Sequence, residues 1–164
     1  MPADRAHEDA FVDELVGLIP QLRAFARSLC NDAAEADDLT QEALARALAA
    51  RSKFTLGSNM RAWAYTILKN QFYSGKRRAW RSAPLDPEVA ESTLVAVSNP
   101  TANLELDELR RALAMLPEKQ REALVLIAAA GLSYDEASQI CGAAVGTVKS
   151  RVSRARDGLA LIYA

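Results

Sequence analysis

The stretch LSYDEASQICGAAVGTVKSRVSRARDGL, residues 132–159, predicts two helices joined by a tight turn. Ser133 begins the first helix, and Glu136 three residues later completes a capping box, in which each side chain binds the other residue's backbone N–H. Gly142 stands where the chain must reverse, often through a positive φ that other residues resist. With Ala137 and Ile140 as the apolar face, this spacing is typical of a helix-turn-helix.

The second helix of this motif carries many cationic and short polar side chains. Cations neutralise phosphates and short polar groups reach base edges, so the pattern indicates DNA binding. The simpler alternative is a solvated helical pair, but the cap, the turn glycine and the basic helix all agree with DNA binding. The residues concerned are Thr147, Lys149, Ser150, Arg151, Ser153, Arg154 and Arg156.

The composition predicts an all-α protein. Half of the 164 residues are hydrophobic, Ala and Leu abound, and β-branched runs are scarce. No apolar run reaches the ~20 residues that a membrane-spanning helix needs, and the acidic N-terminus is unlike a signal peptide. We therefore expect no membrane insertion and a cytoplasmic location.

The sequence offers no evident cofactor or metal site. One histidine and two cysteines, Cys30 and Cys141, give no metal-ligand spacing, so we expect no metal and no cofactor. Both cysteines fall at apolar helical positions, which predicts buried free thiols. No Ser/His/Asp arrangement and no Gly-rich phosphate loop is evident, so we do not expect an enzyme.

The net charge of −1 hides a strong segregation of charge. Residues 1–52 carry ten acids against five bases, whereas residues 53–82 carry seven bases and no acid. Residues 83–122 are acidic again, and residues 123–164 carry four bases against three acids. Two basic blocks separated by acidic ones suggest two DNA contacts and an acidic surface for a partner.

Hydrophobic periodicity predicts helices on both sides of a Pro-rich segment. In the N-terminal part we expect Pro20 in the first turn of one helix and Asn31 or Asp32 capping the next. A long helix is expected from about Asn59 to about Arg78, with Trp63 and Ile67 on its core side.

The segment 82–103 holds three prolines and no sustained amphipathic period, which predicts a flexible linker. We therefore expect two small helical domains, residues 1–81 and 104–164, that sample many relative orientations. Thr101 should start the first helix after the linker, and Pro117 should open the next. The inward positions of the first helix are expected to be Leu104, Leu109, Leu113 and Leu116.

Taken together, the order of these segments resembles the bacterial extracytoplasmic-function (ECF) sigma factors. The resemblance rests on the acidic DDLTQE helix (37–42), the WAYTILKN helix (63–70) with its basic tail, the Pro-rich linker and GTVKSRVSRAR (146–156). The runs SNMRAWAYTILKNQFYSGKRR and LRAFARSL are most similar to the EcfG-like general-stress subgroup. The resemblance implies sigma region 2, a linker and sigma region 4, and a promoter-specificity subunit of RNA polymerase.

The resemblance also implies roles for residues in the first domain. The DDLTQE helix would dock on the clamp helices of the polymerase β′ subunit through Asp37, Asp38, Gln41 and Glu42. The loop from Lys53 to Asn59 would capture a flipped base of the −10 element, with Phe54 stacking on it; Phe54 as a core anchor is an equally good interpretation. The −10 strand would further be lined by Arg61, Lys69, Lys76, Arg77 and Arg78. The role of Tyr73 stays open.

In the second domain, the resemblance places Ser150, Ser153 and Arg154 in the major groove of the −35 element. Thr147, Lys149 and Arg151 would hold phosphates or neighbouring base edges, and region 4 would also meet the polymerase β flap. Ala144 stands where the family usually has Ser or Pro, and alanine is a poor N-cap. The start of the recognition helix is therefore expected to fray until a phosphate docks on its N–H groups.

The implied regulation is a dedicated anti-sigma factor, released by a response regulator with a sigma-like domain. Two other classes of protein fit the sequence less well. A one-component repressor or activator would leave the basic block at 53–82 without a role. A sigma mimic that binds only an anti-sigma factor should lose the basic residues of the last helix, and this chain keeps them.

Overall fold

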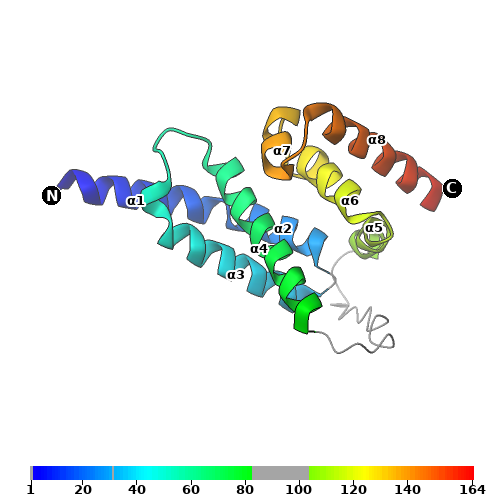
Figure 1. The fold of residues 1–164 in the computed structure, drawn as a ribbon, viewed down its shortest axis with the longest axis horizontal. Coiled ribbons are helices and arrows are strands. Elements are labelled where there is room, and N and C mark those ends of the chain that lie inside the picture. Colours follow the sequence, from blue (N-terminus) through cyan, green and yellow to red (C-terminus); the bar gives the residue numbers. More distant parts are fainter. Residues whose placement is uncertain (1, 31, 83–103) are drawn as a thin grey trace.

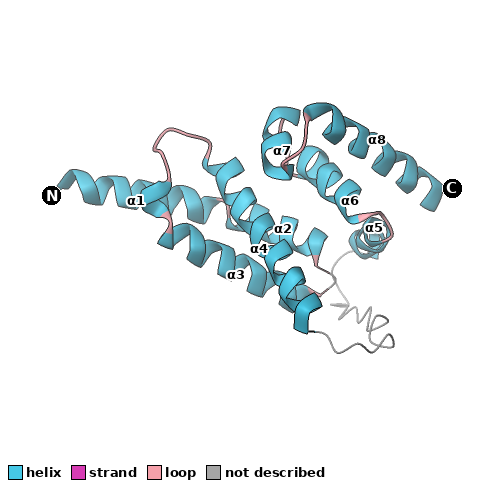
Figure 2. Cartoon of the chain, viewed as in Figure 1, coloured by secondary structure: helices cyan, strands magenta, loops and turns pink. Residues whose placement is uncertain are grey.

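The computed structural model describes residues 2–30, 32–82 and 104–164, and every regular element in these ranges is a helix (Figure 2). This confirms the all-α prediction. The N-terminal elements are α1 (Pro2–Gly17), α2 (Ile19–Leu29), α3 (Ala33–Ala49), the 3₁₀ turn η1 (Arg51–Lys53) and α4 (Met60–Ser82). The C-terminal elements are α5 (Leu104–Ala114), α6 (Glu118–Leu124), the π-helical turn η3 (Val125–Ala129), α7 (Tyr134–Cys141) and α8 (Val145–Ile162).

Local signals place the helix boundaries of the first domain. Pro20 lies in the first turn of α2, as predicted, where its missing N–H costs nothing. The Asp32 side chain caps α3 by accepting a hydrogen bond from Ala34 N–H at 3.3 Å. The core of this domain is formed where α2, α3 and α4 meet, around the buried side chains of Phe25, Tyr65 and Leu68.

The second domain has the predicted helix-turn-helix at α7 and α8. Ser133 and Glu136 form the complete capping box of α7, and Gly142 ends that helix in the left-handed conformation with φ of 61°. Ala144 precedes α8 without a side-chain cap, as expected. One stripe of α8 is fully buried against the rest of the domain, at Val148, Val152 and Ala155.

The two domains share an interface, which corrects our expectation of independent domains. Figure 1 shows α7 beside the first half of α4 and α6 beside α2, and residues of both helix pairs are in contact. The expectation of independent domains rested only on the composition of the linker, residues 82–103, whereas the contact is made by surfaces of the folded domains. Residues 83–103, including the predicted start of a helix at Thr101, lie outside the described residues.

The apolar face predicted for the first helix of the second domain is only half correct. Leu116 is buried and Leu113 packs against the core, but Leu104 and Leu109 are exposed. The reason is geometric: α5 buries only Ala112 of its own residues, so its first turns project beyond the surface that could cover them. Among the described residues, no helix has the length and apolarity needed to cross a bilayer.

Both cysteines are free and buried, as predicted. Burial raises the pKa of each thiol to about 12, from an ordinary value of 9.0. The thiolate is the nucleophile in disulfide exchange, so both thiols should be inert in the folded chain at pH 8. Because the folded pKa is raised, these groups should also lower stability as pH rises from about 9 towards 12.

We expect an aromatic disulfide reagent to react with no thiol in native protein at pH 8, and with two after denaturation. The measurement is the absorbance of the released thiolate. Rapid reaction of either cysteine in the native chain would show that its burial is transient.

Candidate nucleic-acid and polymerase interfaces

The acidic face of α3, made of Asp37, Asp38, Gln41 and Glu42, points away from the hydrophobic core. Asp38 and Gln41 are exposed, while Asp37 forms an ion pair of 3.0 Å with Arg23 of α2. Glu42 accepts a hydrogen bond of 2.5 Å from the Gln71 amide of α4. The face is thus accessible and partly fixed in place by neighbouring helices, which suits a cationic partner.

At Phe54, in the loop before α4, the structure favours one of the two interpretations that the sequence left open. The Phe54 ring is buried and packs against Phe11 of α1 and Trp63 of α4, with centroid distances of 5.6 and 5.0 Å. Phe54 therefore anchors the loop and is not free to stack on a base. The alternative interpretation, a core anchor, holds because aromatic side chains from two distant helices converge there. Lys53 and Asn59, at the two ends of the loop, are exposed.

Several polar residues predicted to bind DNA contact the second domain in this structure. Asn59 caps α4 through its side-chain oxygen, which accepts from Ala62 N–H at 3.0 Å, and its amide donates to Glu136 at 2.5 Å. Lys69 donates to the backbone oxygen of Ile140, and Lys76 pairs with Glu118.

Arg61 lies at the same junction. A Cβ atom placed on Gly131 would lie 3.9 Å from its guanidinium. Hydrogen bonds lower the pKa of Glu136, chiefly that from Ser133 N–H and also that from Asn59, and the charge of Arg61 adds to this effect. By contrast, Arg77 and Arg78 near the end of α4 are exposed.

Tyr73, whose role the sequence left open, contacts the second domain as well. Its hydroxyl donates a hydrogen bond of 2.5 Å to Glu122, a carboxylate that is only 1 % exposed. Burial raises the pKa of Tyr73, and the hydrogen bond and charge of Glu122 raise it further. The phenol therefore remains a donor to this carboxylate throughout the neutral range.

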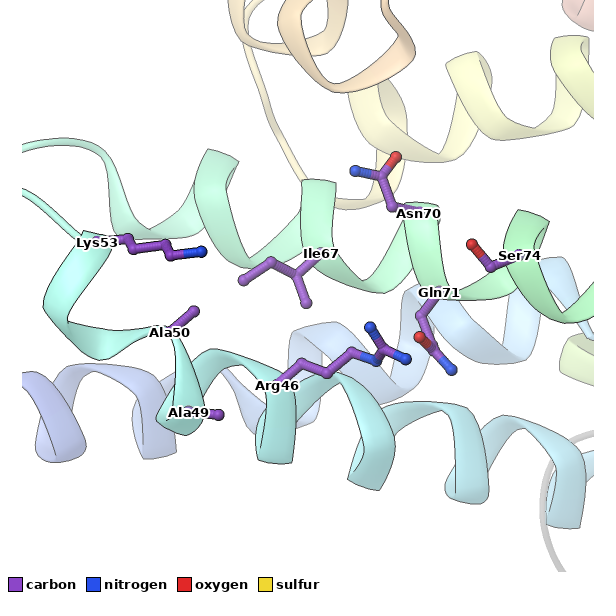
Figure 3. Close-up of a pocket in the computed structure, with 8 residues that line it drawn as sticks. All are labelled: Arg46, Ala49, Ala50, Lys53, Ile67, Asn70, Gln71 and Ser74. Atoms are coloured by element: carbon purple, nitrogen blue, oxygen red, sulfur yellow. The ribbon is translucent and has the colours of Figure 1, made fainter.

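A pocket of about 440 Å³ lies between α3 and α4 on the other side of α4 from these contacts (Figure 3). Arg46, Lys53 and Gln71 point into the space between the two helices, around Ile67. Its size falls within the range of small-molecule sites. Two cations and two carboxamides suit an anionic ligand with a hydrogen-bonding edge. The lining residues are Arg46, Ala49, Ala50, Lys53, Ile67, Asn70, Gln71 and Ser74.

Of these lining residues, sequence reasoning identified only Lys53 as a DNA contact and missed Arg46, Asn70, Gln71 and Ser74. The signal was weak, because Arg46 stands alone on α3, and Asn70, Gln71 and Ser74 on α4 look like an ordinary polar side of a helix. The pocket arises only when α3 packs beside α4, which no local pattern encodes.

The helix-turn-helix presents a polar surface on α8. Thr147, Lys149, Ser153 and Arg154 are exposed, whereas Ser150 and Arg151 are half-buried. The Lys149 ammonium lies 5.5 Å from the centroid of the Tyr134 ring, a cation–π distance that restricts its side chain. No group of His, Cys, Asp and Glu in the described ranges has the arrangement of a metal site.

Comparison with protein-family models matches both halves of the chain. Residues 17–82 match Sigma-70 region 2, and residues 106–158 match Sigma-70, region 4. The chain is 49 % identical over 156 residues to the ECF RNA polymerase sigma factor EcfG of Rhodopseudomonas palustris (strain TIE-1), covering 94 % of this chain and 86 % of the relative. It is 38 % identical over 131 residues to the ECF RNA polymerase sigma factor SigC of Mycobacterium tuberculosis, covering 79 % and 70 %.

Two solved structures are similar along most of the chain. One is the sigma factor RpoE in complex with the anti-sigma factor NepR from Bartonella quintana, with a TM-score of 0.83, 45 % identity and coverage of 92 % and 94 %. The other is CnrH in complex with the cytosolic domain of CnrY, with a TM-score of 0.72, 27 % identity and coverage of 95 % and 88 %.

Proposed function

We propose that this chain, which belongs to the ECF family of RNA polymerase sigma factors, recruits core RNA polymerase to stress-response promoters and starts transcription there. It would act in the cytoplasm by binding these promoters specifically and opening their DNA strands. The observation that carries the proposal is that one chain has two surfaces suited to DNA. One is the pocket between α3 and α4, with the cations Arg46 and Lys53, and the other is the polar face of α8. The region between them, 82–103, would set their separation.

We assign residues 1–81 to core-polymerase and −10 binding, and residues 104–164 to −35 binding. The general-stress assignment is supported by the 49 % identity to EcfG and by the motifs of the α4 helix. The solved relative RpoE is held by an anti-sigma factor, and we extend that partner to this chain. Release by a sigma-mimicking response regulator would then free it to bind polymerase.

The direct test is co-purification with core RNA polymerase followed by run-off transcription from promoters selected out of a genomic library. We expect the chain to bind core enzyme and to produce discrete transcripts. A chain that binds promoter-sized duplexes but neither binds core enzyme nor supports transcription would instead be a repressor or activator.

Core docking should depend on the acidic face of α3. Replacing Asp38 by arginine should weaken core binding at least tenfold, because it places a like charge against the cationic clamp. Asp38 is exposed and makes no described ion pair, so circular dichroism should stay unchanged. Asp13→Arg on α1 is the matched control, since it is an exposed reversal of the same kind. Equal core affinity of the two variants would contradict the assignment.

The pocket between α3 and α4 is our candidate for the extruded −10 base. Extrusion costs a few kcal/mol, which a pocket must recover through hydrogen bonds and nearby cations. The Asn70 amide can donate and accept, and Arg46 and Lys53 would neutralise flanking phosphates.

Replacing Asn70 by alanine should therefore slow promoter melting and lower run-off yield about tenfold, the effect of losing a hydrogen bond worth roughly 1–2 kcal/mol. Binding to core polymerase should be unchanged. Melting is measured by permanganate footprinting, with promoter DNA already opened at the −10 element as the control. The ratio of run-off yield on pre-opened template to yield on duplex should be higher for Asn70→Ala than for the wild-type chain. If this ratio is the same in both proteins, Asn70 plays no part in base capture.

A further inference from the structure

The last two turns of α4, residues 76–82, lie outside the folded core. Every residue in this stretch is exposed, whereas the buried positions of α4 end at Phe72. The helix contains no acidic residue. Its exposed end carries the arginines Arg77, Arg78 and Arg81. This end of α4 is therefore a projecting cationic helix, whose charge a polyanion would complement.

Trp80 stands among these arginines and is 86 % exposed, more than any other large hydrophobic side chain in the described part of the chain. Tryptophan is highly buried on average. The other tryptophan of this chain, Trp63, packs its ring against those of Phe11 and Phe54. The Trp80 ring has no such cover from the described residues, so both its faces are available to a ligand.

The arginines continue the line of the pocket between α3 and α4. Asn70 and Ser74 line this pocket, and Arg77 and Arg81 follow them at spacings of three and four residues, which keeps all four on one side of α4. Arg77 also donates a hydrogen bond of 3.2 Å to Ser74 Oγ. Trp80 is three residues from Arg77, so the two side chains are neighbours on the helix surface. A strand that leaves the pocket along the arginines thus reaches the Trp80 ring.

An exposed aromatic ring among cations is the combination that binds single-stranded nucleic acid. The cations follow the phosphates while a base stacks on the ring, and the stacking tolerates any base. Trp80 lies ~9 Å beyond Ser74 along the helix axis. Stacked nucleotides of one strand are ~3.4 Å apart, so the ring would meet a base about two or three nucleotides from the base held in the pocket.

We propose that Trp80 is a second base-binding site for the opened promoter strand, in which the indole stacks on one unpaired base and Arg77, Arg78 and Arg81 hold the flanking phosphates. The inference deepens the proposed function and rests on it for the promoter as the ligand. Because Trp80 is exposed in the free chain, the stacking itself can be measured without core polymerase.

The first measurement is the tryptophan fluorescence of the full chain. Trp63→Phe leaves Trp80 as the sole tryptophan, and a single-stranded oligonucleotide of random sequence should quench its emission at low salt. Trp80→Phe is the matched control and should show no quenching, because its remaining tryptophan packs against two phenylalanine rings. An unquenched Trp80, or equal quenching by a fully paired duplex of the same length, would overturn the proposal.

The second measurement is the affinity of the free chain for the same oligonucleotide, carrying a fluorophore at one end. Trp80→Leu should bind about five- to tenfold more weakly than the wild-type chain, since it loses the stacking of one base. Trp80→Phe retains a flat aromatic ring and should keep most of the affinity. Val16→Ala, a truncation of an exposed apolar side chain on α1, should change nothing. Equal affinities of Trp80→Leu and Trp80→Phe would show that the ring does not stack.

Run-off transcription with core enzyme tests the proposed function separately. Trp80→Leu should lower the run-off yield from duplex promoter while binding core polymerase as the wild-type chain does. Loss of core binding in Trp80→Leu would make Trp80 a protein contact and refute the proposal. If the wild-type chain supports no transcription but shows the quenching and the ring-dependent affinity, the proposed function is wrong and the single-strand site remains.

Discussion

Replacing Leu68 by alanine should lower the free energy of unfolding of the first domain by about 2–5 kcal/mol. Leu68 is 0 % exposed and lies on α4, one turn from Tyr65, whose ring packs 5.0 Å from that of Phe25 on α2. The substitution would leave a cavity where three helices meet. Domains of this size shift by about 4–8 °C per kcal/mol, so thermal unfolding followed by circular dichroism should detect it readily.

The control is Leu161→Ala, which removes the same atoms from a side chain that is 79 % exposed, and should change stability by less than about 0.5 kcal/mol. The α7–α8 part of the second domain packs around Ile140 and Val148, so its unfolding should shift less than that of the first domain in Leu68→Ala. Equal shifts in the two domains would mean that the interface between them makes them unfold as one unit.

Helix ends were the most predictable part of this fold. The capping box of Ser133 and Glu136, the left-handed Gly142 and the cap at Asp32 all follow from residues within four positions of each other. The buried residues of α8, which are Val148, Val152 and Ala155, also recur at the helical period of 3.6 residues. Such signals need no knowledge of the rest of the chain, and the structure confirms them.

Features that depend on distant segments could not be read from the sequence. Phe54 is buried because Phe11 and Trp63 converge on it, and a single sequence does not show that convergence. Leu109 is spaced from the neighbouring leucines as a core residue of a helix would be, yet it is exposed because no neighbouring surface reaches it. The pocket and the interface between the domains likewise exist only through the packing of α4 against α3 and α7.

This difference explains why the candidate sites were only partly predictable. On α8 the buried stripe fixes which residues are free, so local periodicity is enough to nominate a DNA-facing surface. On α4 nearly every side of the helix is in use, since one face meets the core, one the pocket and one the second domain. The charges of α4 alone could not show which of its cations are accessible to DNA and which contact the second domain.

The −35 surface should separate into base-reading and phosphate-binding residues. Arg154 is exposed on α8 and free of described ion pairs, so we expect its guanidinium to read a base edge. Arg154→Ala should then cost about 1–3 kcal/mol on the preferred duplex and much less on a mismatched one, which relaxes discrimination. Lys149, held near the Tyr134 ring, is a phosphate ligand in this view.

Lys149→Ala should therefore weaken binding to all duplexes alike and reduce the slope of log affinity against log salt by about one unit. Arg110→Ala on α5, whose side chain already pairs with Asp107, is the control for loss of one positive charge. Competition binding to duplexes selected from a random library, repeated at several salt concentrations, measures both effects. If Arg154→Ala and Lys149→Ala lose affinity equally on matched and mismatched duplexes, Arg154 contacts phosphate, and base reading must come from Ser150 and Ser153.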